Sequence, residues 1–323
     1  MLNIDGSHGE GGGQIVRSAV ALSVAFKKGI RITNIRAGRK QPGLKMQHLY
    51  ALRALQEFTS AKVRGLELGS TELEFSPRKW SRKEVVVSIP TAGSIGLVLQ
   101  ALVPALITAP FPAIVRFQGG ATCGKWSPPL DFITNVLFPD LRLFGIKSPQ
   151  VNVLQEGYYP KGGAVVDVKV FPSSPHPAKI LERGKIIRIR GISHASLLLR
   201  ERKVAERQAI RGIQIRYSPS LSPGSCLTLW AECENTIIGA DALGQRGKRA
   251  EDVKKEAWQN LQQELRQGAF DSHTTDMLIP FIALAGRGEI TSSKITSHTL
   301  TNIWLCEQFT KKKFRVKGNL ISY

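Results

Sequence analysis

The chain has 323 residues, of which 42% are hydrophobic and 22% charged, and it carries a net charge of +20. This composition excludes a disordered protein and is typical of a globular chain with two or more lobes. The excess of Lys and Arg favours a polyanionic partner, with nucleic acid the leading class, although a generally basic proteome gives the same charge. The four cysteines form no Cys-x-x-Cys pair, which indicates a reducing cytoplasm rather than a disulfide framework or a zinc signature.

The first distinctive segment is the glycine-rich stretch Asp5–Arg17, which runs directly into an apolar helical pattern. Glycines let the backbone approach a ligand closely, and the N–H groups at a helix start attract anions. With Glu10, Gln14 and Arg17 in the same span, we interpret it as a phosphate site with a metal nearby; the alternative is a glycine-rich turn. It lacks the Gly-Lys-Ser/Thr of a Walker A loop, and no βαβ unit precedes it, so it is no dinucleotide fingerprint either.

A helix–strand–loop pattern recurs at Gly13–Arg36, Ser94–Gly120 and Thr275–His298. A second helix and a strand pair follow each occurrence: Leu44–Phe58, Lys62–Leu68 and Glu72–Phe75; Asp131–Phe144, Gln150–Gln155 and Ala164–Val170; Leu300–Gln308, Phe314–Val316 and Leu320–Tyr323. The pattern predicts an α+β fold of three βαβαββ-type repeats, with helices packed on four-stranded sheets.

The apolar stretch Ile95–Val115 is long enough to cross a membrane. It contains Gln100 and three prolines and ends in a strand-like segment, so we interpret it as a helix buried on all sides and expect no membrane partner.

Between the second and third occurrences of the helix–strand–loop pattern, the composition of the sequence changes. A proline-rich linker precedes a run of strands and helices whose last helix has Val253, Ala257, Leu261 and Leu265 on one face. This predicts a smaller inserted α/β domain at residues 178–270. Residues 1–177 would then hold the first two repeats, and residues 271–323 the third, completed by strands near the insert. The basic residues of the insert have two explanations, nucleic-acid contact and a solvated helix face, of which we favour the second.

A further cluster has the residue types that phosphate chemistry requires. Arg36, Arg39 and Lys40 lie within five positions, and a helix with Gln47 and His48 follows. The fork of a guanidinium binds phosphate oxygens bidentately, although a solvated basic turn looks the same in sequence.

His298 is the best nucleophile among the six histidines, because small hydroxyl residues surround it and it follows the strand and loop of the third pattern. An imidazole nitrogen can attack phosphorus and form a covalent intermediate, but a single histidine is more often structural.

Several separated motifs together resemble the RNA 3′-terminal phosphate cyclase family. They are Glu10–Arg17, Ile35–Arg39, Pro42–Gly43, Gln47–His48, Gly93–Gln100, Gly119–Gly120 with Pro128–Pro129, Tyr159–Ala164 and Ser297–Asn302. The resemblance covers essentially the whole chain, with the insert the loosest part.

The resemblance implies an enzyme with three repeats similar to the C-terminal domain of a bacterial translation initiation factor, plus an inserted domain. It implies an ATP-dependent ligase-type reaction in which RNA 3′ ends carrying a phosphate become 2′,3′-cyclic phosphates. The steps pass through a histidine-linked AMP and an RNA adenylate, and they release pyrophosphate and AMP. A divalent metal, Mg²⁺ or Mn²⁺, would assist. The resemblance leaves the oligomeric state open, with a homodimer as one option.

The resemblance also implies roles for single residues. His298 would be the catalytic residue and would act as the nucleophile. The positions matching ATP contacts are Glu10, Gln100, Pro128, His273, Thr274, Thr275, Asp276 and Met277. Glu10 also matches the acid near the metal. The positions matching contacts with the phosphates of ATP or of the RNA end are Arg17, Arg36, Arg39 and Gln47.

The chain departs from the family pattern in three places. His273 stands where a tyrosine is frequent, and Asp276–Met277 where Asp-Gln is frequent, so nucleotide preference or affinity is open. Ala121–Cys123 replaces a threonine-aspartate pair, with no interpretation from sequence. The rival functions are a non-catalytic cyclase-like RNA-binding protein of ribosome assembly and an enolpyruvyl transferase of related repeat architecture. Retention of His298 and Glu10 argues against the non-catalytic protein. An enolpyruvyl transferase would require neither a nucleophilic histidine nor the high positive charge of this chain.

Overall fold

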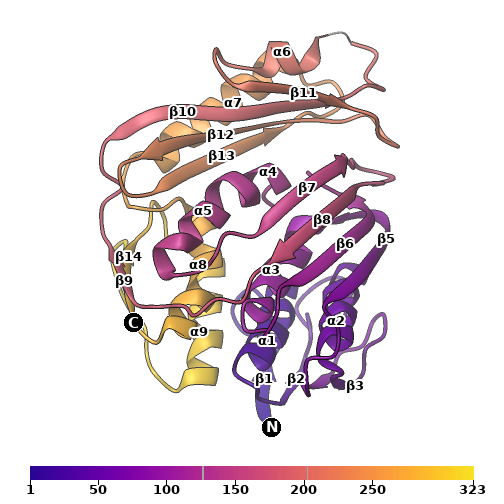
Figure 1. The fold of residues 1–323 in the computed structure, drawn as a ribbon, viewed down its shortest axis with the longest axis vertical. Helices are drawn as coiled ribbons and strands as arrows, with labels where there is room; N and C mark the ends of the chain where they lie inside the picture. Colours follow the sequence, from indigo (N-terminus) through magenta and orange to yellow (C-terminus); the bar gives the residue numbers. More distant parts are fainter. Residues whose placement is uncertain (126, 202) are drawn as a thin grey trace.

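The structure, a computed structural model, describes residues 1–125, 127–201 and 203–323. Within these residues, four four-stranded sheets and the helices that cover them confirm the α+β class (Figure 1). Three of the sheets belong to the body of the protein, and the fourth belongs to a segment inserted in the chain.

The elements follow one another in the same sequence in each part of the body. The first part contains β1 Leu2–Asp5, α1 Gly13–Ala25, β2 Ile30–Thr33, α2 Met46–Thr59, β3 Lys62–Arg64 and β4 Leu73–Ser76. The second contains β5 Glu84–Ser94, α3 Ile95–Leu106, β6 Ala113–Ala121, a helical segment of α4 Leu130–Phe132, η1 Ile133–Leu137, α5 Phe138–Leu141 and η2 Arg142–Phe144, then β7 Gln150–Gln155 and β8 Val165–Val170. The third contains β9 Ala178–Ile180, α8 Ser272–Ala285, β14 Gly288–Thr291, α9 Ser297–Thr310, β15 Arg315–Lys317 and β16 Leu320–Ser322.

The three body sheets share one strand order and one set of pairing directions. The orders are β1-β2-β4-β3, β5-β6-β8-β7 and β9-β14-β16-β15. In each, the first two strands are parallel and the other two pairings are antiparallel. A parallel pair requires a crossover, which α1, α3 and α8 provide in the three sheets.

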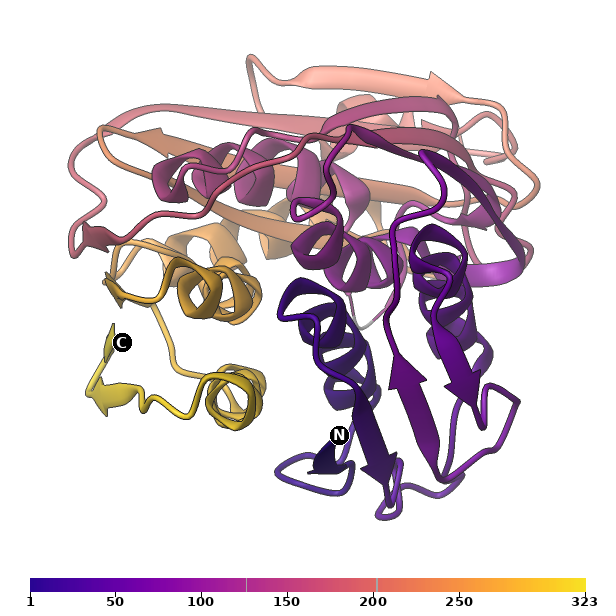
Figure 2. The same ribbon diagram turned by 60° about the horizontal axis from the view of Figure 1, so that its bottom comes forward.

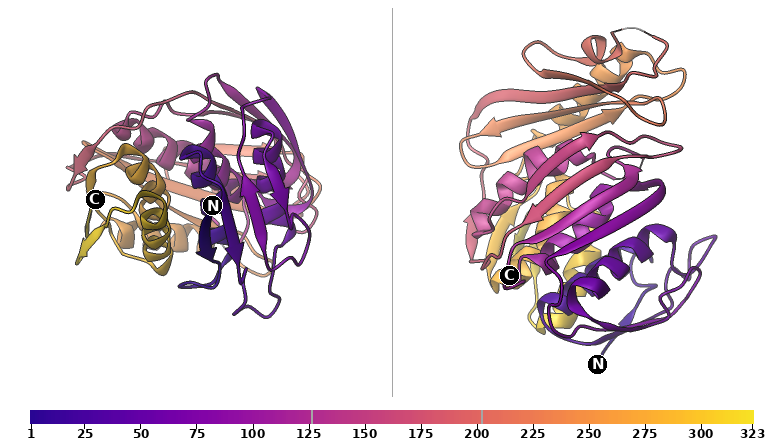
Figure 3. Two further views of the ribbon diagram at one scale, coloured as in Figure 1. Left: turned by 90° about the horizontal axis from the view of Figure 1, so that it is seen from below. Right: turned by 45° about the vertical axis from the view of Figure 1, so that its right-hand side comes forward.

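The inserted segment forms its own sheet between β9 and α8. Its elements are β10 Ile186–Ser196, α6 Val204–Gln208, β11 Gln214–Ser218, β12 Ser225–Cys233, β13 Ile237–Leu243 and α7 Ala250–Glu264, with strand order β11-β10-β12-β13. This sheet lies above α4 and α5 of the second part (Figure 1; Figure 3, right). β9 falls inside the range predicted for the insert, residues 178–270, but it pairs with β14 of the third sheet.

The body helices gather inside the molecule, and the sheets lie outside them. α1 lies beside α8 and α9, although these segments come from opposite ends of the chain (Figure 2; Figure 3, left). One continuous core of buried residues joins all three parts. Its strands alternate as expected for one covered face: in β5, Val85 and Val87 are buried, whereas Val86 is exposed.

The apolar stretch Ile95–Val115 is a short internal helix followed by a strand. α3 ends at Leu106, and β6 begins at Ala113. α3 packs against α1, α2 and α8, which explains why nearly all of its residues are apolar. Among the described residues, no helix combines the length and the hydropathy that crossing a bilayer requires.

Several element boundaries differ from those expected. The helix expected at Asp131–Phe144 is divided into α, π and 3₁₀ pieces, and Pro139, which cannot donate a backbone hydrogen bond, lies inside it. α6, the first helix of the insert, is only five residues long. The strand β13 of the insert was not anticipated. α9 begins at Ser297, three residues before the predicted start at Leu300.

Candidate active site

The first turn of α9 carries His298 and is held by a buried carboxylate. Thr296 caps the helix, because Thr299 N donates to Thr296 Oγ1 at 3.0 Å and Thr296 N donates to Thr299 Oγ1 at 3.0 Å. Asp276, buried on α8, accepts hydrogen bonds from both hydroxyls, at 2.7 Å from Thr296 and 2.5 Å from Thr299. Burial raises the pKa of Asp276, and the two hydroxyl donors oppose that rise. The position of His298 is therefore fixed from below by α8.

The imidazole of His298 is oriented by two side chains of the glycine-rich segment. Its Nδ1 lies 2.5 Å from Gln14 Oε1 and 3.2 Å from Glu10 Oε2. Gln14 Nε2 also donates to the carbonyl oxygen of His298, at 3.2 Å. An amide oxygen accepts hydrogen bonds and cannot donate them, so Nδ1 carries a proton, and in the neutral form of the ring the lone pair is on Nε2. The side chain is 52% exposed, which leaves this nitrogen open to a substrate.

Glu10 connects three parts of this site. One of its carboxylate oxygens accepts a hydrogen bond from the hydroxyl of Ser297, and the other faces His298. Arg39 donates from Nη2 to the Glu10 carbonyl oxygen at 3.0 Å and lies 3.9 Å from its carboxylate. Glu10 therefore sits between the imidazole and an arginine.

The glycine-rich loop before α1 also packs directly on α9. Gly9 has a φ of +58°, and a Cβ there would come within 2.7 Å of Thr301 Oγ1. Only glycine combines this backbone conformation with such a close approach. One residue earlier, the His8 ring stacks on Trp304, with centroids 3.8 Å apart and planes 11° from parallel. These contacts hold the loop against the helix that carries the histidine.

The N-terminus of α1 lacks a side-chain cap. Its N-cap is Gly12, with no side-chain hydrogen bond, and its first turn contains no acidic residue. The backbone N–H groups of such a helix start favour an anion.

His48, a residue of α2, places an unpaired donor beside the start of α1. Burial, followed by the charges of Arg17, Arg36 and Lys45, lowers its pKa to about 3, so the ring is neutral. Its Nδ1 accepts from Lys45 N at 3.0 Å, which places the proton on Nε2. Among the described residues Nε2 has no hydrogen-bond partner, and a Cβ on Gly13 would overlap it.

Three arginines surround the same helix start. Arg17 is 8% exposed, and burial followed by the charge of Arg36 lowers its pKa to about 10. Burial and the charge of Arg39 lower the pKa of Arg36 as well. Mutual repulsion of this kind is relieved when an anion binds between the cations. The electrostatics of this region therefore favour a multiply charged anion such as a phosphate chain.

Two pairs of the residues matched to ATP contacts differ in their surroundings. Gln100 on α3 donates from Nε2 to Met277 Sδ at 3.2 Å, which places these two predicted contacts side by side. Thr274 and Thr275 are fully buried and are hydrogen-bonded to Asp271, the N-cap of α8. Their side chains support the helix rather than face solvent.

Of the remaining predicted contacts, His273 lies at the start of α8, whereas Pro128 and Gln47 lie on other segments. His273 is exposed, and its ring packs edge-on against Phe132, with centroids 5.9 Å apart. Pro128 is buried, with its carbonyl oxygen close to Gly96 at the beginning of α3. Gln47 is partly exposed on α2, one residue before His48.

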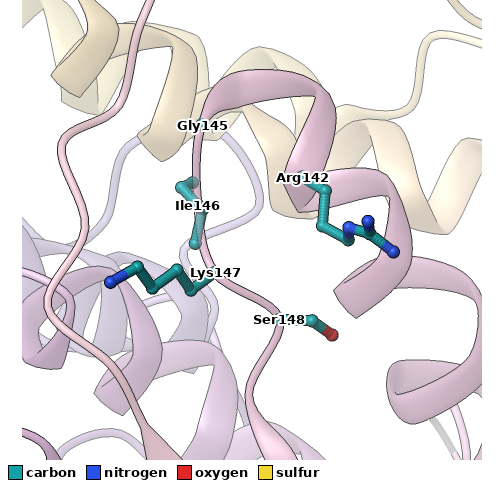
Figure 4. A pocket seen from close by; sticks show the side chains of 5 residues that line it. All are labelled: Arg142, Gly145, Ile146, Lys147 and Ser148. Atoms are coloured by element: carbon teal, nitrogen blue, oxygen red, sulfur yellow. The ribbon is translucent and has the colours of Figure 1, made fainter.

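A hollow on the surface, of about 430 Å³, lies elsewhere. It is lined by Arg142, Gly145, Ile146, Lys147 and Ser148, at the end of the divided helix of the second part (Figure 4). No predicted site residue lines this hollow, and its walls include neither a histidine nor a carboxylate, so it carries no part of the chemistry described above.

Comparison with known proteins identifies the family of the site. The family model described as RNA 3′-terminal phosphate cyclase matches residues 8–316. The chain is 44% identical to the RNA 3′-terminal phosphate cyclase of Pyrococcus furiosus over 99% of this chain and 96% of that protein. It is 45% identical to that of Thermococcus kodakarensis, over 99% and 95%, and 43% identical to that of Ignicoccus hospitalis, over 99% and 96%. The chain belongs to the RNA 3′-terminal phosphate cyclase family.

As a member of the cyclase family the chain is an enzyme, as the resemblance of its motifs predicted. A solved enolpyruvyl transferase, NikO from Streptomyces tendae, matches half of this chain with 17% identity and a TM-score of 0.27, a likeness too low to carry an argument.

The structure of this cyclase-family chain brings several of the predicted site residues together. Glu10 contacts both Arg39 and His298, and Asp276 reaches His298 through the helix cap. The sequence indicated Gln14 only as part of the glycine-rich phosphate motif and not as a partner of His298. A polar residue in the first turn of an otherwise apolar helix was the available signal.

Proposed function

We propose that this chain is an ATP-dependent RNA 3′-terminal phosphate cyclase that works through a covalent adenylate on His298. The observation that carries the proposal is the orientation of His298, whose Nδ1 is bound by Gln14 and Glu10 while Nε2 remains open. Family membership supports the overall reaction, because the relatives with 43–45% identity bear that name.

In the first step, Nε2 of His298 attacks the α-phosphorus of ATP. A nitrogen–phosphorus bond forms, the bond to the bridging oxygen breaks, and pyrophosphate leaves. The imidazole then bears a positive charge, which the carboxylate of Glu10, 3.2 Å from Nδ1, stabilises. The uncapped start of α1 and the buried Arg17 and Arg36 are suited to hold the phosphates during this step.

In the second step, an oxygen of the RNA 3′-phosphate attacks the same phosphorus, and the bond to His298 breaks. In the third step, the neighbouring 2′-hydroxyl attacks the 3′-phosphorus, loses its proton and expels AMP, which closes the 2′,3′-cyclic phosphate. Ring closure directly from a phosphate monoester lacks a good leaving group. Transfer of AMP provides one, which explains why ATP is required.

Glu10 is also the residue that fits a divalent cation. Its carboxylate is 27% exposed, next to the arginines proposed to hold phosphates. Mg²⁺ is commonly held by one or two carboxylates together with substrate phosphates, so one exposed carboxylate is a sufficient protein ligand. When bound, the cation would neutralise charge on the phosphates of ATP.

The first experiment is incubation with α-³²P-labelled ATP and Mg²⁺, followed by denaturing electrophoresis. We expect an acid-labile label on the protein, lost in His298→Ala and retained in His176→Ala, which alters an exposed histidine of the linker. Absence of label from the wild-type chain, or labelling of His298→Ala, would favour the non-catalytic RNA-binding alternative.

The second experiment follows the RNA. An oligonucleotide with a 3′-phosphate should give a 2′,3′-cyclic end only when ATP is present. The same oligonucleotide with a terminal 2′-deoxy nucleotide should stop at the adenylated end, because it lacks the hydroxyl that displaces AMP. A cyclic product formed without ATP would contradict the proposed order of steps.

A further inference from the structure

A second cluster of reactive side chains is buried where the inserted sheet meets the second body sheet. His194 on β10 and Cys226 on β12 lie directly opposite each other in the antiparallel register. Cys123 follows the end of β6 and reaches the same point from the body. The exposed fractions are 1% for His194, 0% for Cys226 and 6% for Cys123. One ligand atom from each of the three lies within 4.8 Å of the other two.

The two nitrogens of His194 face different surroundings. Nδ1 lies 2.7 Å from the Tyr158 hydroxyl, and Tyr158 packs in one buried cluster with Cys123 and Cys226. Nε2 lies 3.6 Å from Asp131 Oδ2. A carboxylate behind the second ring nitrogen is the usual companion of a histidine that binds a metal, because it fixes the tautomer and the ring orientation.

The carboxylate side of His194 already contains a cation. Arg216 Nη2 lies 2.8 and 2.9 Å from the two oxygens of Asp131 and 2.8 Å from Glu156 Oε1. A metal placed among Asp131, Glu156 and His194 would compete with this guanidinium. On the thiol side the Cys226 sulfur interacts with the Cys123 thiol and with His194, and it lies 3.9 Å from a neutral hydroxyl, Thr228 Oγ1. The thiol side is therefore the place for an added cation.

We propose that Cys123, Cys226 and Nδ1 of His194 bind a thiophilic divalent ion, with Zn²⁺ the best match and the Tyr158 hydroxyl facing the fourth position. Two sulfurs and one imidazole nitrogen select Zn²⁺ over the oxygen-seeking Mg²⁺ and Ca²⁺. The ligand atoms lie within 4.8 Å of one another, so small inward movements of the three side chains bring them to zinc–sulfur distances of about 2.3 Å and a zinc–nitrogen distance of about 2.0 Å. Binding forms two metal–sulfur bonds and one metal–nitrogen bond, and it releases to solvent the two thiol protons and the proton that a charged His194 carries on Nδ1.

The site gives a reason for Cys123, one of the residues that depart from the family pattern. Cys123 belongs to the body, whereas His194 and Cys226 belong to the insert. An ion held by all three links the inserted sheet to the second body sheet. None of these residues contacts His298, so the ion is structural and independent of the proposed cyclase reaction.

The test uses the full-length protein, purified under reducing conditions and without added metal. We expect about one Zn²⁺ per chain by elemental analysis, as for a structural site with three or four protein ligands. Replacement by Co²⁺ should give thiolate-to-cobalt charge-transfer absorption in the near ultraviolet. Both signals should be lost in Cys123→Ser and in Cys226→Ser and kept in Cys233→Ser, which changes another buried cysteine of β12.

A second measurement keeps the proposal testable if the serine variants fold poorly. The wild-type protein, freed of metal by a chelator, should unfold at a lower temperature and recover its stability when Zn²⁺, but not Mg²⁺, is added. Lack of charge-transfer absorption in the Co²⁺-treated wild-type chain would overturn the proposal. So would the same absorption in both serine variants, or a Cys123–Cys226 disulfide in the metal-free purified protein, detected by mass spectrometry.

Discussion

Gln14 and His298 bind each other through two hydrogen bonds across 284 residues of sequence. The amide oxygen of Gln14 accepts a hydrogen bond from Nδ1 of the His298 ring, and the amide nitrogen of Gln14 donates one to the backbone carbonyl of His298. One side chain thus fixes both the rotation of the imidazole and its place relative to α1. Gln14 is a positioning residue, since it acts on the substrate only through His298.

Replacement of Gln14 tests this positioning role. We expect Gln14→Ala to slow formation of the protein-bound adenylate about 100-fold, the order of loss produced by a small misplacement of a reacting group. Gln14→Glu keeps an acceptor at Nδ1 and loses only the bond to the carbonyl, so its loss should be smaller. Single-turnover labelling measures both rates. Equal rates in the wild type and in Gln14→Ala would mean that the bond has no catalytic role.

Gly13 and His48 provide a test of packing at the start of α1. A Cβ on Gly13 would overlap the buried His48 Nε2, so Gly13→Ala should lower the free energy of unfolding by about 1–3 kcal/mol. Gly38→Ala, in the arginine loop, is the matched control, because a Cβ there meets nothing within 4 Å. Urea unfolding gives both values. If the two variants were equally stable, His48 would not occupy the place described.

The neutral state of His48 predicts a pH dependence of stability. Its folded pKa, about 3, is below its ordinary value of 6.5, so between these values the unfolded chain binds more protons than the folded one. The contribution of His48 is therefore complete above pH 6.5 and is lost as the pH falls towards 3, by about 1.4 kcal/mol for each pH unit.

The measurement is urea unfolding of the wild type and of His48→Asn at pH 7 and pH 5. The asparagine keeps an acceptor for Lys45 N but does not titrate. We expect the wild type to lose about 2 kcal/mol more than the variant between the two pH values. Parallel losses would show that His48 remains charged in the folded protein.

The crowding of the arginines predicts opposite effects on stability and on anion binding. In Arg36→Asn, the pKa of Arg17 should rise because a neighbouring charge is removed, and the ligand-free protein should be at least as stable as the wild type. Asparagine also tolerates the φ of +56° at this position. Pyrophosphate should bind at least about 10-fold more weakly, the loss expected from one charge-assisted contact.

Calorimetric titration with pyrophosphate checks this prediction, with Arg53→Asn as the control for a loss of charge on the exposed face of α2. If the two variants weakened binding equally, the total charge of the protein, rather than a built site, would account for the attraction.

Single helices and strands of this fold could be predicted from the sequence, whereas the pairing of strands far apart in the chain mostly could not. The strand Gln150–Gln155 was predicted to the residue, because alternation and the flanking turn are local signals. Strands near the insert were expected to complete the third part, but the position of β9 could not be predicted, because its pattern spans only three residues and its partner β14 follows only after the whole insert. Pairing at such a distance leaves no periodic trace in either segment.

The same division applies to the candidate site. The phosphate-binding character of the glycine-rich segment and of the arginine loop could be predicted, because residue type alone indicates it. The role of Gln14 could not, since it depends on a contact with the other end of the chain. Thr274 and Thr275 resembled ATP contacts in sequence, whereas their hydrogen bonds to Asp271 are visible only in three dimensions.

The order of strands in the third sheet has a consequence for how the protein is made. During synthesis β9 emerges early, but its neighbour β14 appears only after β10–β13, α6, α7 and α8. The inserted sheet can therefore form first, and in doing so it brings its two ends towards each other and shortens the loop that β9 and β14 must close. The insert would then assist folding of the third body sheet. Its removal should slow folding of the enzyme even where the reacting groups are unchanged.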